Sequence, residues 1–304
     1  MKIGLCYYQP APHATCRSFL LGETKGGNVM TANVTTSKER TPPEFTHVPF
    51  RVARAAETAV QMGLVTLETD LTIETELRHF IGGAVGTDIG HGQPPTILHS
   101  RIACDDQVTV ENLTAMKERF ADALALFPPG YHFDVIGYGC TSASLLIGED
   151  TVQAIVKSHV DVADVTTPLT GARRALKAVG ARNIGYLAPY ISEISEKMCF
   201  LLEDDGFEIG AAATFGEGRD SIVGCIHPKS ILDAIDAIIS SATIPLDAIF
   251  ISCTSLKCAT IIAIAESKYG IPIISSNSAI AWDMARLARL AMSANEKGLL
   301  FQQD

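Results

Sequence analysis

The strongest constraint on the fold is a pattern of alternating segments that fills most of the chain. From about residue 62 to 295, short apolar runs alternate with longer runs whose apolar residues recur at helical spacing. Strands that alternate with helices of this length form βαβ units. The sequence therefore predicts an α/β fold in which a mostly parallel sheet is flanked by helices.

The alternating segments also form two similar halves. The segment DVIGYGCTS at 134–142 returns as DAIFISCTS at 247–255, with the Asp six residues before the Cys in both. In each half, the strand after the next helix ends in two small hydroxyl residues, Thr166-Thr167 and Ser275-Ser276. Internal duplication of this kind predicts two pseudo-symmetric lobes that face each other. We expect residues 58–167 plus 276–304 in lobe 1 and residues 168–275 in lobe 2.

Residues 1–57 differ from the rest of the chain. They are polar and rich in turn residues, without a sustained period. We expect a poorly ordered N-terminal extension.

The composition excludes several classes of function. The 304-residue chain has a formal net charge of -10 and no run of Lys or Arg, so we expect no nucleic-acid partner. Apolar runs are far shorter than the roughly 20 residues of a membrane span, and we expect no membrane partner. The eight cysteines occur singly, with no Cys-x-x-Cys pair. This usage is typical of a reduced, cytoplasmic protein, and neither a metal site nor a cofactor motif is predicted.

The two Cys-Thr-Ser turns are the main candidates for chemistry. Each cysteine is expected at the carboxyl end of a strand, where parallel α/β sheets bind ligands, and just before a helix. A helix N-terminus binds anions and lowers the pKa of a thiol. Duplicated context therefore favours Cys140 and Cys253 as catalytic residues, whereas we interpret the other six cysteines as structural. The substrate-binding hydroxyls predicted around them are Thr141, Ser142, Thr254 and Ser255.

Four segments together resemble the aspartate/glutamate racemase superfamily. They are GYGCTSAS at 137–144, APY at 188–190, ISCTSLK at 251–257 and IPIISSNSAIAW at 271–282. The branch with maleate cis-trans isomerase, arylmalonate decarboxylase and the ectoine-utilisation protein EutA is most similar. GLVTLETDLTIETELR at 63–78 favours the EutA-like subgroup. The resemblance implies two pseudo-symmetric lobes with the active site between them, no cofactor, and two cysteines acting on opposite faces of a carbon α to a carboxylate.

The resemblance also implies three further substrate-binding residues. Tyr190 matches the substrate tyrosine of the family, and Asp70 and Asp220 stand where the family has asparagines. An acid at position 70 would repel a carboxylate unless it is protonated or faces an amine, so it favours a substrate with an amino group. Asp is also a common helix N-cap, which leaves a structural role open for both acids.

These observations lead to one preferred function and several alternatives. We expect a cofactor-independent racemase or cis-trans isomerase that acts on a small carboxylate or amino acid, an ectoine-derived one included, and that forms a dimer or tetramer. The alternatives are an arylmalonate-type decarboxylase, a two-lobe metabolite-binding protein without chemistry, and a redox protein that uses Cys140 and Cys253 as a dithiol.

Overall fold

The computed structural model describes residues 43–50, 59–82, 85–86, 94–292 and 297–303. The chain divides into two units, residues 1–50 and 51–304. Within the first unit, residues 43–50 are exposed and have no regular secondary structure. The rest of the extension predicted at 1–57 lies outside the described residues. All elements below belong to the second unit.

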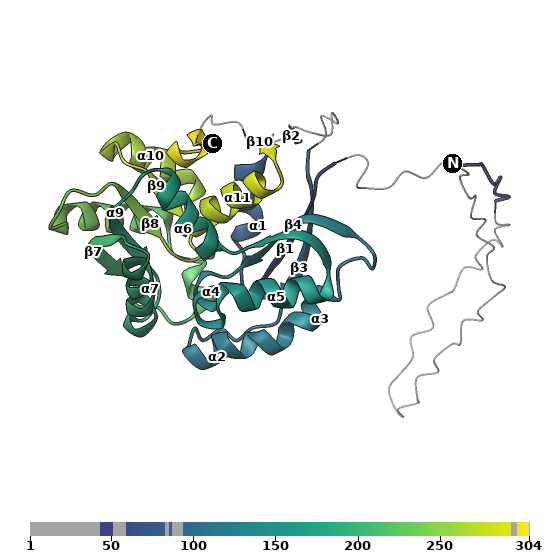
Figure 1. Ribbon diagram of the computed structural model, residues 1–304, viewed down its shortest axis with the longest axis horizontal. Helices are drawn as coiled ribbons and strands as arrows, with labels where there is room; N and C mark the ends of the chain where they lie inside the picture. The colour runs from purple at the N-terminus through teal and green to yellow at the C-terminus, as the bar shows by residue number, and fades with distance from the viewer. Residues whose placement is uncertain (1–42, 51–58, 83–84, 87–93, 293–296, 304) are drawn as a thin grey trace, which may run out of the picture. The chain divides into compact units, whose positions relative to one another are not determined.

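Two four-stranded parallel sheets form the centre of the second unit (Figure 1). The first has the order β3-β1-β4-β5 and the second the order β7-β6-β8-β9. In both sheets the second strand along the chain lies at an edge beside the first, and the third and fourth follow on the other side. The predicted α/β fold and its two similar lobes are therefore confirmed. The strands are β1 Gln61–Leu67, β3 Thr96–Ile102, β4 His132–Gly139, β5 Asp161–Thr166, β6 Asn183–Ala188, β7 Glu208–Thr214, β8 Ala248–Ile251 and β9 Ile273–Ser275.

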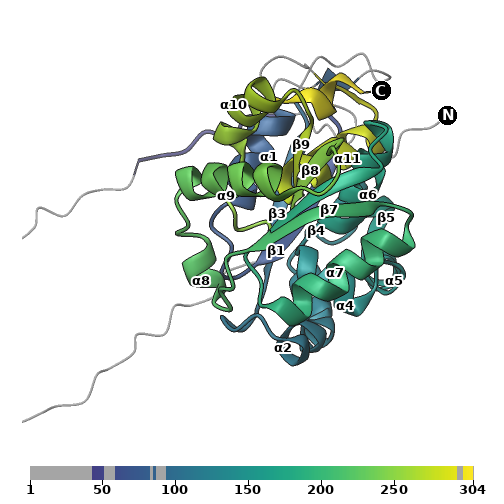
Figure 2. The ribbon, with the colours of Figure 1, turned by 90° about the vertical axis from the view of Figure 1, so that its left-hand side faces the viewer.

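The helices cover the faces of these sheets (Figures 1 and 2). In the first half they are α1 Ile73–Ile81, α2 Val110–Ala115, the 3₁₀ helix η2 Met116–Arg119, α3 Phe120–Leu124, α4 Thr141–Ile147, α5 Glu149–His159 and α6 Pro168–Ala178. The second half contains α7 Ser192–Asp204, α8 Asp220–Val223, α9 Pro228–Ser241, α10 Ala259–Tyr269, α11 Ser276–Leu287 and the 3₁₀ helix η3 Leu299–Gln302. A small antiparallel pair joins β2 Val85–Gly86 to β10 Leu290–Ala291. None of the helices within the described ranges has the length and apolar character that a membrane crossing requires.

The acid that begins each duplicated segment has the same structural role in both halves. Asp134 accepts a hydrogen bond from the backbone N–H of Gln61, the first residue of β1, over 2.7 Å. Asp247 accepts from the N–H of Asn183, the first residue of β6, over 2.8 Å. Each acid therefore fixes the start of its third strand beside the start of the first.

The last long helix returns to the first sheet. Helix α11 follows β9 of the second sheet, yet it contacts β4, β5, α1 and α6. The contact with α6 is so close that a Cβ at Gly171 would lie 2.6 Å from the carbonyl oxygen of Ala279. This packing links the two halves of the chain. The lobe boundaries expected at 167/168 and 275/276 remain predictions.

The segments that follow the two cysteines differ. After Cys140, residues 141–159 form two helices, which are separated at Gly148, where φ is 89°. The helix expected directly after Cys253 begins only at Ala259. The residues between form a turn, which changes the surroundings of that cysteine.

Candidate active site

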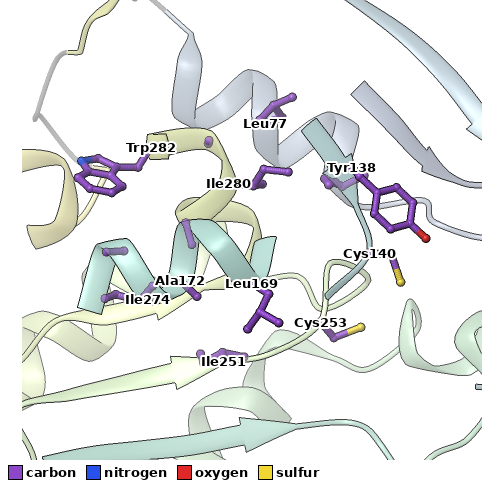
Figure 3. Close-up of a cluster of buried hydrophobic side chains, with 14 of the residues drawn as sticks. Leu77, Tyr138, Cys140, Leu169, Ala172, Ile251, Cys253, Ile274, Ile280 and Trp282 are labelled. Carbon is purple, nitrogen blue, oxygen red and sulfur yellow. The ribbon is translucent and has the colours of Figure 1, made fainter. Parts of the chain in front are cut away.

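Cys140 and Cys253 line the same cavity. Cys140 follows β4 and Cys253 lies just beyond β8, which are the third strands of their sheets. Figure 3 shows both sulfurs turned toward the same side of the buried core. The space open to water-sized molecules is about 20 Å³, enough for about one water. The structure therefore brings the two predicted catalytic cysteines together in a nearly closed site.

The Cys140 thiol is held at the start of α4. Its Sγ accepts a hydrogen bond from the N–H of Ala143 over 3.4 Å and lies 3.7 Å from the Ser142 hydroxyl. Burial nevertheless raises the pKa of Cys140 to about 12. The expectation that the helix start lowers the pKa is wrong for this enclosed site, because loss of solvent outweighs these hydrogen bonds.

Cys253 occupies a strained turn instead of a helix start. Its φ is 137°, in the region that L-residues avoid. Its N–H donates to the hydroxyl of Ser276 on α11 over 3.0 Å. Burial, followed by the nearby Asp220 carboxylate, raises the pKa of this thiol well above its ordinary value. The predicted position just before a helix was therefore wrong for Cys253.

Three of the four predicted hydroxyls donate to other protein groups. Thr141 donates to Ser276 over 2.8 Å, and Thr254 donates to the carbonyl of Gly139 over 3.3 Å. Ser255 donates to Asp220 over 2.9 Å. Ser142 is the fourth; its hydroxyl lies 3.7 Å from the Cys140 sulfur and it lines the cavity. Binding of a substrate carboxylate by these four hydroxyls remains a prediction. Because the other three donate to protein groups, Ser142 is the main candidate.

Tyr190 also lines the cavity, just after β6, the first strand of the second sheet. Its hydroxyl accepts a hydrogen bond from Ser252 over 3.4 Å. Burial, together with the nearby Cys253 sulfur, raises the pKa of Tyr190 well above its usual range. The phenol therefore stays neutral and keeps a proton that it can donate to a ligand.

Asp70 has a structural role at the start of α1. Its Oδ1 accepts from the N–H groups of Thr72 and Ile73 over 2.7 and 2.9 Å. Its Oδ2 is buried without a hydrogen-bond partner. Burial raises the pKa of this carboxyl group. Asp70 is not among the residues that line the cavity.

Asp220 does line the cavity. One of its oxygens accepts from Ser255 over 2.9 Å and the other from the hydroxyl of Thr69. Asp220 is the first residue of α8, but the N-cap is Arg219 and its side chain makes no capping bond. The two acids therefore differ. Asp70, which the motif comparison placed opposite a substrate amine, accepts from N–H groups at the start of α1, whereas Asp220 lines the cavity. The substrate-binding role expected for Asp70 stays a prediction.

Two buried residues that sequence reasoning missed support the Cys253 turn. Glu76 on α1 accepts from the N–H of Cys258 over 2.6 Å, and Asn277 on α11 donates to the carbonyl of Thr254 over 2.8 Å. The sequence held one signal for Glu76, because it stands on the apolar stripe of its helix, between Ile73 and Phe80. In the part of the chain that the structure describes, no group of three His, Cys, Asp or Glu side chains is placed to hold a metal ion.

Comparison with known proteins identifies the family. The family model for arylmalonate decarboxylase matches residues 116–301. The chain belongs to this family. Its membership places it in the aspartate/glutamate racemase-like superfamily that the motifs indicated, whereas the EutA-like subgroup remains a prediction.

Two relatives of known function are similar in sequence. Maleate isomerase of Nocardia farcinica is 26% identical over 255 residues, which cover 80% of this chain and 96% of that protein. Arylmalonate decarboxylase of Bordetella bronchiseptica is 25% identical over 123 residues, 40% of this chain and 51% of that protein. The family member described here is therefore an enzyme of the isomerase or decarboxylase type.

Solved structures show the same fold. The Nocardia farcinica maleate cis-trans isomerase with a covalently bound succinylcysteine intermediate superposes with a TM-score of 0.71 at 23% identity, covering 81% of this chain and 99% of that one. An arylmalonate decarboxylase in its liganded form superposes with a TM-score of 0.66 at 22% identity, covering 80% and 99%. At these identities the likeness supports the fold alone.

Proposed function

We propose that this protein is a cofactor-independent isomerase, of the racemase or cis-trans type, that acts at the carbon α to a carboxylate. The observation that carries the proposal is the pair of thiols, Cys140 and Cys253, each just beyond the third strand of its sheet and both lining one nearly closed cavity. Two sulfurs in one small cavity can serve one substrate carbon, one as base or nucleophile and the other as proton donor. The substrate is a small carboxylate or amino acid, an ectoine-derived one included.

Proton transfer between the thiols accounts for a racemase. One sulfur, as thiolate, takes the α-proton, and the electron pair of the broken C–H bond moves into the carboxylate as an enediolate. The other thiol then gives its proton to the opposite face of the same carbon. Since burial keeps both sulfurs protonated in the free protein, forming the thiolate must be coupled to substrate binding.

The same pair accounts for cis-trans isomerisation. The thiolate of one cysteine adds to one carbon of the double bond and forms an S–C bond, while the π electrons move to the other carbon and take the proton of the second thiol. After rotation about the resulting single bond, the second sulfur takes a proton back from that carbon, the double bond forms again and the first thiolate leaves, which gives the other isomer. The succinylcysteine captured in the Nocardia farcinica enzyme is such an S–C adduct, and the 26% identity of that protein supports the comparison.

Tyr190 and Ser142 are the donors proposed for the substrate carboxylate. Both line the cavity, and the Tyr190 hydroxyl remains protonated. Hydrogen bonds to a carboxylate strengthen as charge develops on it, so they stabilise the enediolate more than the bound substrate. Thr141, Thr254 and Ser255 support the two turns through the contacts described above.

A decarboxylase is the second candidate, because the matching family model is that of arylmalonate decarboxylase. Loss of CO₂ would generate the same enediolate, and one thiol would suffice to protonate it. The two mechanisms predict different results for the two cysteines. Decarboxylation needs one of them, whereas isomerisation needs both.

The test is a ¹H NMR screen in D₂O against amino acids, diaminobutyrate derivatives, maleate and arylmalonates. The wild type is expected to introduce solvent deuterium at the α-carbon or to interconvert isomers. Cys140→Ala and Cys253→Ala should each lower the rate at least about 10²-fold, the lower limit for general acid–base catalysis. Cys225→Ala, at an exposed cysteine, serves as the control. Retained turnover in both single variants would exclude the proposal, and loss in only one would favour the decarboxylase.

A further inference from the structure

We infer that Asp220 is a recognition site for a positively charged group of the substrate, so that the substrate carries an ammonium group beside its carboxylate. This inference rests on the proposed function and narrows its substrate class. It depends on where the carboxylate lies, what holds it, and which other charges surround the cavity.

The first argument is the position of the carboxylate. Asp220 lines the cavity together with both thiols, and only 6% of this residue's surface is exposed. Ser255 donates to one of its oxygens over 2.9 Å and Thr69 to the other. Two hydroxyls thus fix its orientation, and each oxygen keeps a further lone pair for a ligand. A carboxylate can only accept, so the ligand group it faces must be a donor.

The second argument is the charge balance. Within the described residues, no Lys, Arg or His side chain lines the cavity. The other acid in its wall, Asp105, is paired with Arg119 over 3.0 Å. Asp70 is a second carboxyl group nearby: the charge of Asp220 contributes to raising the pKa of Asp70. The Oδ2 atom of Asp70 has no hydrogen-bond partner. A substrate with carboxylates alone would meet unbalanced negative charge, whereas an ammonium group would neutralise Asp220.

The third argument links this charge to the thiols. Asp220 raises the pKa of both Cys140 and Cys253 through its negative charge. A bound ammonium group would offset that charge and make the thiolate easier to form. Recognition of the cation would then also activate the thiolate, so that an amine-free analogue binds weakly and leaves the sulfurs protonated.

The test compares ligands that differ only in the amino group. Aspartate with succinate and 2-aminobutyrate with butyrate form two such pairs. Binding is measured by calorimetry and deuterium exchange by NMR, on the full chain. In at least one pair, we expect wild-type protein to bind the member with the additional amino group about ten to a hundred times more tightly than the other member. This is the range of a charge-assisted hydrogen bond.

The variants separate recognition from folding. Asp220→Asn should remove most of this preference, and Ser255→Ala, which frees one oxygen of Asp220, should reduce it about three- to tenfold. Asp105→Asn removes an equal charge that Arg119 already balances, so it should change the preference less than about threefold. Thermal unfolding checks that each variant is folded. If Asp220→Asn fails to fold, the inference is judged on Ser255→Ala, and an unchanged preference in that variant would overturn it.

The outcomes distinguish the two proposals. Equal binding of both members of each pair by the wild type, or equal weakening of both by Asp220→Asn, would overturn the amine inference. Deuterium exchange with maleate or arylmalonates alone would overturn it too, while leaving the proposed isomerase or decarboxylase intact. Selective amine binding without exchange in any substrate would support the Asp220 site and contradict the proposed chemistry.

Discussion

The side-chain amide of Asn277 joins the carboxylate of Glu76 to the turn that carries Cys253. Its Nδ2 group donates to Oε2 of Glu76 over 2.9 Å and to the carbonyl of Thr254 over 2.8 Å. The other oxygen of Glu76 accepts from the N–H groups of Cys258 and Ala259, so this residue of α1 caps α10. Three distant segments are thus tied together directly behind the site.

The titration of Glu76 should make stability depend on pH. Burial raises the pKa of Glu76 from 4.5 to about 7. A folded-state pKa above the unfolded one means that the folded protein holds more protons, so the stabilisation is complete below pH 4.5 and is lost as pH rises through 7. Glu76→Gln should remove on the order of 2–3 kcal/mol of this pH-dependent change. The free energy of urea unfolding, measured between pH 4.5 and 8, checks the prediction.

The control for this measurement is Glu68→Gln, at an exposed acid directly after β1. It should leave the pH profile close to that of the wild type. Glu266, whose pKa is also raised, is present in every variant and cancels in the comparison. Parallel profiles for Glu76→Gln and wild type would show that Glu76 does not titrate in this range.

The strained backbone of Cys253 predicts that a glycine variant is at least as stable as an alanine variant at this position. Its φ of 137° disfavours any residue with a Cβ, which costs on the order of 1–3 kcal/mol, whereas glycine adopts it freely. Cys253→Gly should therefore unfold at a temperature equal to or above that of Cys253→Ala, although both should be inactive. At Cys258, where φ is −107°, the order should reverse. A clearly more stable alanine variant at 253 would contradict the strain.

Asp106 should hold α8, which carries Asp220, in place at the cavity wall. Its Oδ1 accepts from the N–H of Ser221 over 2.8 Å, and its carbonyl accepts from the N–H of Asp220 over 2.9 Å. Nearby, the N–H of Val108 donates to the carbonyl of Gly218 over 2.7 Å. Asp106→Ala loses the side-chain hydrogen bond, worth about 0.5–1.5 kcal/mol, so KM should rise about two- to tenfold. Asp106→Asn keeps an acceptor oxygen and should stay near the wild-type KM. Equal KM values for all three would exclude this role.

The contact between α6 and α11 should not tolerate a methyl group. A Cβ at Gly171 would lie 2.6 Å from the carbonyl oxygen and 2.8 Å from the carbonyl carbon of Ala279. Because both are backbone atoms, α6 or α11 must shift, and Gly171→Ala should destabilise the protein by about 1–3 kcal/mol. Gly224→Ala, whose Cβ would meet its nearest neighbour at 3.9 Å, should cost much less. Equal melting temperatures for the two variants would refute the prediction.

The sequence by itself determined the α/β class, the duplication, and the equivalence of the two cysteines. These features depend on local periodicity and on spacing along the chain, both of which are visible without coordinates. The six-residue interval from Asp134 to Cys140 and from Asp247 to Cys253 corresponds to the third strand of each sheet. The motifs around the cysteines were also sufficient to indicate the superfamily.

Only the tertiary structure decided how the site is supported and charged. Glu76 meets Cys258 from 182 positions away, and Asn277 meets Glu76 from 201, so no local pattern contains these contacts. The different positions of Asp70 and Asp220 likewise depend on which helix each side chain reaches. The raised thiol pKa values follow from burial by both halves of the chain, which outweighs the local effect of a helix start. Spacing reports the order of the elements, whereas solvent exclusion and long-range hydrogen bonds exist only after they pack.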